Sequence, residues 1–247
     1  MNAESKKEVS GKSEEKQEKI EEKKEETPES IKAEPETVFV ICAHPDDEVL
    51  GAGATIAKYV KEGKNIKTII FSYGELGIPM LQRKFSIEKR VKESKNADAM
   101  LGCKDSIFLG IDEGKFIEQC EERQLKEKLK EMFEKEKPSK IFTHSPDDPH
   151  PDHRAVYKTV LEIVGMANVE PDIYMFDIWN PINFRKRNNP RLYVDVSETF
   201  RIKLNALSMF KSQWPSLIIL WPQVLISAFL NGMGCECRYA EKFYKIR

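Results

Sequence analysis

The sequence has no uninterrupted apolar run long enough to cross a lipid bilayer. Its longest apolar stretch, residues 217–230, is about fourteen residues long and is interrupted by Pro222 and Gln223. A membrane-spanning helix needs about 20 consecutive apolar residues. We therefore expect a soluble protein without a membrane span.

An excess of charge of one sign is also lacking, because 41 acidic and 40 basic residues give a net charge of −1. That balance argues against nucleic acid as a partner. Histidine is scarce, with four residues in the chain, and the five cysteines are an odd number with no signal-peptide pattern ahead of them. This combination indicates free thiols in a reducing compartment, so we expect a cytoplasmic protein.

Hydrophobic residues make up 40% of the 247 residues, which is enough for one α/β domain with a buried core. Residues 1–36 differ from the rest, with twelve Glu, eight Lys and few apolar side chains. Such a segment cannot bury enough apolar surface to offset the entropy of ordering it. We predict a disordered, charged extension over residues 1–36, which either aids solubility or docks to a partner, and a catalytic domain over residues 37–247.

From residue 37 onward, apolar runs of strand length alternate with helical patterns. The first run is apolar throughout, as in a strand buried on both faces of a parallel sheet. The predicted strands cover residues 37–42, 66–72, 106–110, 139–143, 172–176 and 191–196. The predicted helices cover residues 49–63, 86–101, 118–137 and 198–212. This alternation predicts a single α/β domain with a Rossmann-like, doubly wound, mainly parallel sheet and helices on both faces.

Two similar blocks each follow a predicted strand and open a predicted helix: Ala-His-Pro-Asp-Asp-Glu at 43–48 and His-Pro-Asp-His at 150–153. One such triplet is typical of a capped helix start, but two at strand ends favour a shared site. His44, Asp47 and His153 offer two imidazoles and one carboxylate, a donor set that catalytic zinc commonly takes. We predict a Zn²⁺ cofactor, although iron and manganese accept the same donors.

The neighbouring residues supply the rest of a hydrolytic site. Asp46 is the predicted general base, which takes a proton from an attacking water. His150, one helical turn before His153, can stabilise an oxyanion or protonate a leaving amine if it is protonated. Whether Asp46 or His150 protonates the amine is left open. Asp152 is predicted to hold and charge one of the imidazoles, while His144 is predicted to be a loop or supporting residue rather than a ligand.

The two blocks resemble the two signatures of the PIG-L/LmbE family of zinc-dependent de-N-acetylases. Weaker similarities extend the resemblance over residues 37–247, at residues 74–77, 90–93, 108–110, 211–213 and 239–243. The resemblance implies the same roles for the histidines and aspartates of the two blocks. It further implies that Arg90 contacts the sugar or its substituent and that Asp152 tunes His150.

Two positions depart from the family pattern. Glu113 stands where the family often has Asp, so a contact to a substrate hydroxyl there is shifted by one methylene. Phe210 stands where many members have His, so a polar role at that position is absent. Neither departure touches the predicted metal ligands, but both concern the substrate.

Together these features predict a metal-dependent hydrolase that removes the N-acetyl group from an N-acetylglucosamine-type substrate, releasing acetate and a free amine. The resemblance implies a small-molecule amino-sugar conjugate, joined to inositol, an inositol phospholipid, a thiol-bearing aglycone or a second sugar. Two alternatives stay open: an amidase or esterase acting on a non-sugar, and a non-catalytic sugar-binding protein. The apolar residues 214–233 either pack as a closing helix or form a homo-oligomer interface.

Overall fold

The computed structural model describes residues 35–77, 82–179 and 187–247. The predicted extension, residues 1–36, lies outside these ranges except for Pro35 and Glu36. Within the described residues, seven strands form one sheet in the order β3-β2-β1-β4-β5-β7-β6. Strands β1 to β5 pair in parallel, and β7 is antiparallel to both of its neighbours. The strands are β1 Thr37–Cys42, β2 Asn65–Ile70, β3 Asp105–Phe108, β4 Lys140–His144, β5 Asp172–Phe176, β6 Arg191–Asp195 and β7 Ala240–Lys245.

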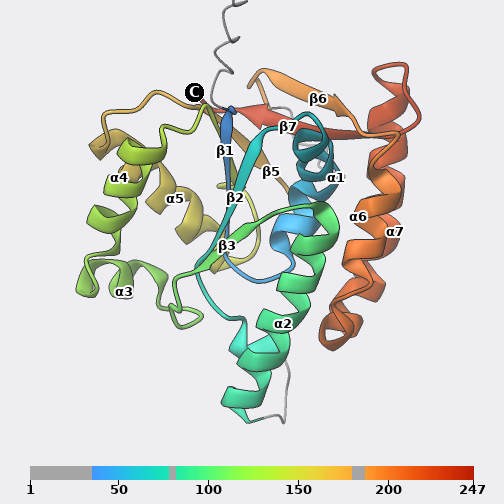
Figure 1. Ribbon diagram of the computed structural model, residues 1–247. Coiled ribbons are helices and arrows are strands. Elements are labelled where there is room, and N and C mark those ends of the chain that lie inside the picture. Colours follow the sequence, from blue (N-terminus) through green and yellow to red (C-terminus); the bar gives the residue numbers. More distant parts are fainter. Residues whose placement is uncertain (1–34, 78–81, 180–186) are drawn as a thin grey trace, which may run out of the picture. The chain divides into compact units, whose positions relative to one another are not determined.

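Helices cover both faces of the sheet, with α1, α2, α6 and α7 on one side and α3, α4 and α5 on the other (Figure 1). Strand β1 explains why both faces need cover, because Val38 and Val40 pack into one core while Phe39 and Ile41 pack into the other. The predicted doubly wound, mainly parallel architecture is confirmed. The helices are α1 Asp47–Lys61, α2 Arg83–Leu101, α3 Phe116–Glu122, α4 Leu125–Glu136, α5 Pro151–Met166, α6 Phe200–Leu207 and α7 Trp214–Met233.

The single helix predicted over residues 118–137 is wrong, because the chain forms two helices there, α3 and α4. They are separated at Gln124, which adopts a positive φ of 50°. On one continuous helix, at about 100° per residue, Leu125 would point about 140° away from Cys120. Both side chains belong to the same buried cluster. The break therefore turns the apolar stripes of two short helices toward one core.

Strand β7 is the element that the sequence patterns do not predict. It lies between β5 and β6, and its second residue, Glu241, is buried. The Glu241 carboxylate forms an ion pair with Lys203 of α6, with Nζ and Oε1 2.6 Å apart. Lys203 Nζ also donates to Leu50 O at 2.7 Å, and Glu241 accepts from Thr55 N at 2.7 Å. This buried ion pair joins β7 and α6 to α1. Because it places a charged residue at a buried position of β7, the strand lacks the apolar pattern by which a buried strand is predicted.

Helix α7 settles the ambiguous stretch at residues 214–233. The helix continues through Pro222 and Gln223, which interrupt the apolar run in the sequence. Among the described residues, the segment Lys211–Met233 is long and apolar enough to cross a membrane by length and composition, with a mean hydropathy of 1.5. Only 28% of that apolar window is buried against the rest of the protein. The closing helix that was one of the two expectations for this stretch is thus present, with most of its apolar window on the surface.

A glycine contact between α1 and β5 gives a test of this packing. A Cβ at Gly51 would lie 2.5 Å from the ring of Phe176. We expect Gly51→Ala to lower the free energy of unfolding by about 1–3 kcal/mol, because the core has to shift. Gly165→Ala in α5 is the matched control: no atom lies within 4 Å of its Cβ, and Ala stabilises helices by up to about 1 kcal/mol over Gly. Urea unfolding followed by circular dichroism measures both, and an unchanged stability of Gly51→Ala would contradict the clash.

Candidate active site

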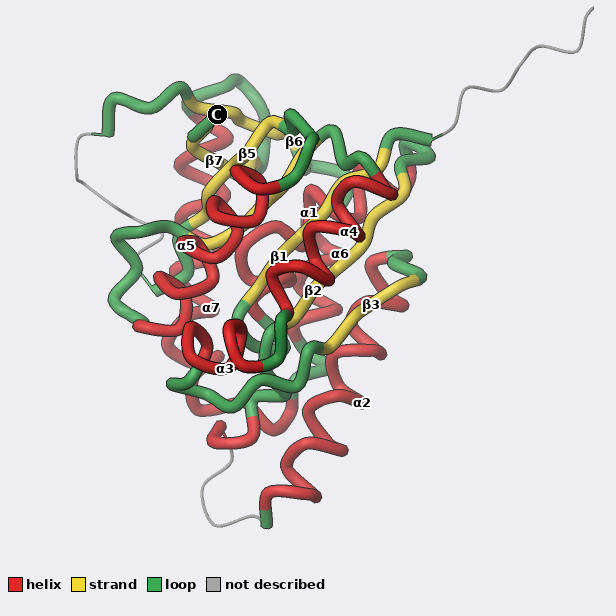
Figure 2. The backbone as a smooth tube through the Cα atoms, turned by 90° about the vertical axis from the view of Figure 1, so that its left-hand side faces the viewer, coloured by secondary structure: helices red, strands yellow, loops and turns green. Residues whose placement is uncertain are grey.

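The two His-Pro-Asp blocks lie side by side at one edge of the sheet. Strands β1 and β4 are neighbours in the sheet, and the strand order reverses between them. On the other side of β1, the strands β2 and β3 follow in succession (Figure 2). Ligands of doubly wound sheets bind in the crevice outside the carboxyl ends of the strands, where the strand order reverses. The block at residues 43–48 directly follows β1, and the block at 150–153 opens α5 after β4. The topology therefore brings two segments that are distant in the sequence to one crevice.

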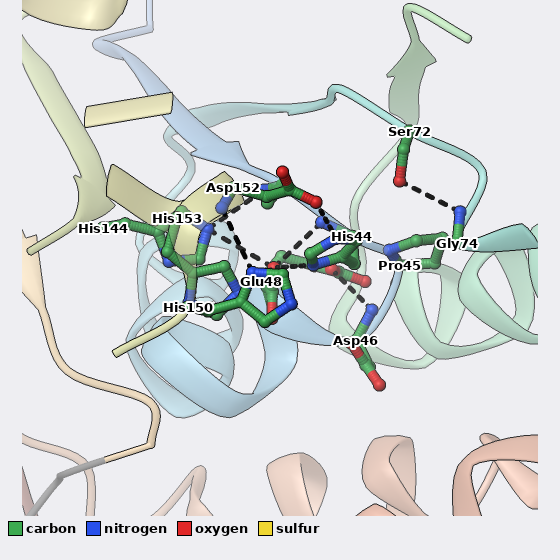
Figure 3. A network of polar contacts seen from close by, with 12 residues as sticks. His44, Pro45, Asp46, Glu48, Ser72, Gly74, His144, His150, Asp152 and His153 are labelled. Atoms are coloured by element: carbon green, nitrogen blue, oxygen red, sulfur yellow. Dashed lines mark hydrogen bonds and ion pairs between the residues drawn. The ribbon is translucent and has the colours of Figure 1, made fainter. Parts of the chain in front are cut away.

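The carboxylate of Asp47 is the point where the imidazoles meet. Its Oδ2 atom lies 3.4 Å from His44 Nδ1 and 3.3 Å from His153 Nε2. The rings of His44 and His153 are 5.5 Å apart between centroids and face the same crevice (Figure 3). Burial by itself would raise the pKa of Asp47, but His153 and His144 outweigh burial and hold that pKa well below its usual value. Asp47 is thus ionised among imidazole nitrogens.

These donors fit a zinc ion by their chemistry. His44, Asp47 and His153 supply two nitrogens and one oxygen, which leaves a fourth position of a tetrahedral ion for water or substrate. Among the described residues, each group of side chains whose ligand atoms lie within 4.8 Å of one another includes His44 or His153. His150 belongs to one of these groups, with both of those histidines. The residues that could hold a metal ion therefore gather at this crevice.

Asp148 is a supporting residue that the sequence patterns do not single out. Its Oδ1 atom lies 3.1 Å from His153 Nδ1, the ring nitrogen opposite the one that faces Asp47. The same oxygen accepts a hydrogen bond from His150 N at 2.9 Å. A carboxylate behind a metal-binding histidine fixes the orientation of its ring. The only signal in the sequence is an acidic residue two positions before the second block.

His144 also supports the site, from the end of β4 rather than from a loop. Its ring stacks on His153 with centroids 3.9 Å apart, and Nε2 lies 3.3 Å from Asp47 Oδ2. Nε2 also accepts a hydrogen bond from Ala43 N at 3.0 Å. Burial, together with the nearby His153, lowers the pKa of His144 to about 4, so the ring is neutral. The Nε2 lone pair is engaged by the backbone, which favours the predicted supporting role, although His144 also forms with Asp47 and His153 a group that could hold a metal ion.

Asp46 occupies a strained turn between β1 and α1. Its φ of 113° and ψ of −28° lie in the left-handed region that favours glycine, a strain that costs of order 1–3 kcal/mol. Buried side chains hold the turn: Glu48 accepts from Asp46 N at 3.0 Å, and Arg90 donates to Pro45 O at 2.6 Å. Ser94 in turn donates to Glu48 at 3.3 Å. The turn directs the Asp46 side chain away from Asp152 (Figure 3).

The environment of Asp46 raises the pKa of its carboxyl group toward 7. Burial raises the pKa of Asp46 to about 7, although the Arg90 guanidinium, 3.6 Å from Asp46 Oδ2, opposes the rise. A general base works best when its pKa lies near the operating pH. The structure therefore places at position 46 a carboxylate with the acidity that the predicted base requires.

His150 and Asp152 are joined by a hydrogen bond at the start of α5. His150 Nδ1 accepts from the backbone N–H of Asp152 at 3.2 Å and so caps α5. Burial and the neighbouring His44 lower the pKa of His150, which favours a neutral ring with its proton on Nε2. The Asp152 carboxylate lies 3.2 Å from His44 Nε2 and accepts from Gly114 N at 3.0 Å. Asp152 therefore contacts His44 directly, as predicted for one of the imidazoles, and its charge also opposes the lowering of the pKa of His150.

The predicted substrate residues, Arg90 and Glu113, both border the cavity at the site, which has a volume of about 140 Å³. Arg90 is buried rather than on the solvated face of α2. Glu113 accepts from Leu76 N at 3.0 Å. Sequence patterns did not single out Trp179 and Leu220, which also line the cavity and come from the loop after β5 and from α7. Gln213 lines it too, whereas Phe210 is buried in the core.

The comparisons with known proteins agree with this geometry. The chain is 26% identical over 220 residues to the diacetylchitobiose deacetylase of Thermococcus kodakarensis. The aligned region covers 83% of this chain and 80% of that protein. The solved N,N'-diacetylchitobiose deacetylase of Pyrococcus horikoshii superposes with a TM-score of 0.73 at 24% identity, over 86% of this chain and 84% of that one.

A second solved structure has the same fold and a different reaction. The 4-carboxy-2-hydroxymuconate hydratase GalB of Pseudomonas putida superposes with a TM-score of 0.74 at 19% identity, over 86% of this chain and 96% of that one. Folds host more than one chemistry, so the fold alone does not define the reaction. The family match is more specific: residues 39–164 match the family described as PIG-L, GlcNAc-PI de-N-acetylase. Because that match spans more than half of the chain and includes both His-Pro-Asp blocks, the chain belongs to the PIG-L family of de-N-acetylases.

Proposed function

We propose that the protein is a zinc-dependent deacetylase that hydrolyses the acetamide of an N-acetylglucosamine-type substrate. The observation that carries this proposal is the buried cluster in which Asp47 meets His44 and His153, in a cavity that Asp46 also lines. Membership of the de-N-acetylase family and the likeness to diacetylchitobiose deacetylases support a sugar acetamide as the substrate. The products are acetate and a free amine.

His44, Asp47 and His153 would hold the zinc ion, with Asp148 orienting the ring of His153. When bound, zinc supplies a Lewis acid that polarises the acetamide oxygen and makes water a better nucleophile. As the oxygen of the water forms a bond to the carbonyl carbon, Asp46 accepts a proton from that water. The pKa of about 7 leaves a large part of Asp46 ionised and ready to accept that proton at neutral pH.

The remaining residues orient the substrate and stabilise its charge. The neutral His150 ring can donate from Nε2 to the carbonyl oxygen as negative charge develops there. Cleavage of the C–N bond then requires a proton on nitrogen. Asp46 can supply the proton that it took from the water, whereas His150 supplies one only in its protonated form. Arg90 and Glu113 border the same cavity and are the proposed sugar contacts, with the aromatic ring of Trp179 beside them.

Acetate release from a panel of substrates tests the proposal. The panel contains N-acetylglucosamine conjugates, including diacetylchitobiose, and simple non-sugar amides and esters. We expect the wild type to release acetate from at least one sugar conjugate. If the protein cleaves simple amides or esters but none of the sugar conjugates, the proposal is wrong and the protein is a hydrolase of non-sugar substrates. Binding of sugars without turnover would identify a sugar-binding protein of the same fold.

Replacing the proposed base tests its role in the chemical step. Asp46→Asn keeps the size of the side chain but removes its proton affinity. We expect kcat to fall by about 10²–10⁴-fold, while zinc content, measured by mass spectrometry of the purified protein, stays at the wild-type level. Retention of more than a tenth of the wild-type kcat with full zinc content would assign the base to another residue.

Replacing the supporting carboxylate tests the role of Asp148 behind His153. We expect Asp148→Asn to weaken zinc binding by about 10–100-fold, because the ring of His153 loses a charged partner. Asp147→Asn is the matched control, since this neighbouring carboxylate pairs with Arg187 at 3.0 Å instead of a histidine. Competition with a zinc chelator measures both affinities. Equal affinities for the two variants would contradict the supporting role.

A further inference from the structure

Helix α7 presents an outer face made entirely of apolar side chains. Every residue of Trp214–Met233 that is exposed is apolar, and the partly buried residues between them include Ser216, Ser227 and Asn231. The exposed members are Trp214, Pro215, Ile218, Ile219, Pro222, Leu225, Ile226, Phe229, Leu230 and Met233. Monomeric soluble proteins rarely expose contiguous apolar patches of more than a few hundred Å². This outer face of α7 therefore indicates a partner.

The same segment carries no charge. Residues 212–235 contain no acidic residue, Lys, Arg or His. Charged side chains that are exposed flank the segment, with Lys211 at its start and Glu236 and Arg238 after its end. A partner that matches this face must itself be apolar over the length of the helix and polar beyond its ends. Twenty helical residues extend about 30 Å, so the matching apolar surface is long.

An apolar groove extends this face toward α6. It has a volume of about 690 Å³, and its lining includes Phe210, Trp214, Leu217 and Trp221. Lys211 is one of the few polar residues that line the groove. An apolar groove beside an exposed ammonium matches the chemistry of an anionic lipid, with an acyl chain in the groove and its phosphate near Lys211. The indole of Trp214, which is 63% exposed, suits the boundary between lipid and water.

We propose that the outer face of α7 binds the surface of a lipid bilayer, with the helix lying in the plane of the interface. Helices that lie in the interface bury an apolar face about 5–10 Å into the boundary between headgroups and acyl chains. The inner face of α7 excludes a spanning arrangement for the folded protein. Leu217, Leu220 and Val224 are buried in the core, and a Cβ on Gly232 would lie 2.6 Å from Cys237 O. A membrane-spanning α7 would lose these contacts with the core.

A second copy of the chain fits the face less well than a bilayer. Protein interfaces surround their apolar centre with polar side chains and carry about one hydrogen bond per 100–200 Å². Among the exposed side chains of α7, only the indole N–H of Trp214 can form such bonds, while the polar side chains of Ser216, Gln223, Ser227 and Asn231 are partly buried. Binding to a bilayer requires no such hydrogen bonds, because the backbone N–H and C=O groups of a helix are paired within the helix.

Docking through α7 would also place the catalytic cavity close to the lipid. Ser216 and Leu220 of the same helix, together with Gln213 directly before it, line that cavity. The membrane contact and the active site therefore share one helix, although the residues that form them differ. The proposal goes beyond the deacetylation proposed above and does not depend on it, because lipid binding is measured without turnover.

Vesicle sedimentation tests the proposal with the full chain. Vesicles of phosphatidylcholine and phosphatidylglycerol are mixed with the wild type, with Ile226→Glu/Phe229→Glu, and with Ile117→Glu/Met166→Glu. The residues of the first pair are 48% and 52% exposed on α7, and those of the control pair are 44% and 45% exposed on α3 and α5. We expect the α7 variant to partition onto vesicles at least about tenfold more weakly than the wild type, because charge in the apolar region is costly. The control variant is expected to bind as the wild type does.

Two further measurements separate the outcomes. Circular dichroism and thermal unfolding verify that each variant is folded, and sedimentation velocity without lipid gives the oligomeric state. A monomeric wild type that binds vesicles through α7 supports the proposal. Absence of vesicle binding by the wild type, or equal binding by all three proteins, overturns it. A lipid-free dimer that the α7 substitutions dissociate, with no binding of the wild type to vesicles, assigns the face to a second copy.

Discussion

The site depends on one buried carboxylate, Asp47, that must stay ionised among imidazoles. Removing a charge from water is costly unless partners replace the lost hydration, and His44 and His153 do so from two different segments. These segments meet only because β1 and β4 are neighbours where the strand order reverses. The doubly wound topology is therefore a condition for the donor set, and the rest of the site is arranged around it.

Backbone strain next to this carboxylate gives Asp46 its role. The positive φ at Asp46 is unfavourable for a residue with a Cβ, and such strain persists only where the surroundings determine it. Arg90 and Glu48, both buried, hold the turn from α2 and α1. The same turn that directs Asp46 toward the cavity also desolvates it, which brings its pKa toward neutrality. Position and acidity of the proposed base thus have one structural cause.

Helix α7 combines two roles that are usually separate. Its inner face closes the core and lines the catalytic cavity, while its outer face is apolar and uncharged. An apolar face exposed to water has an unfavourable hydration free energy. A partner that covers the face removes this cost. The helix that carries this exposed face therefore also forms part of the wall of the catalytic cavity.

The sequence by itself determined the strands β1 and β5, the alternation of strands and helices and the donors at 44, 47 and 153, because periodicity and side-chain chemistry are local properties. Only the tertiary structure decided the break between α3 and α4, the place of β7 and the support of His153 by Asp148. It also turned the Asp152 carboxylate toward His44 and left one face of α7 exposed. These features depend on contacts between residues far apart in the chain, and no short-range pattern records which elements will pack together.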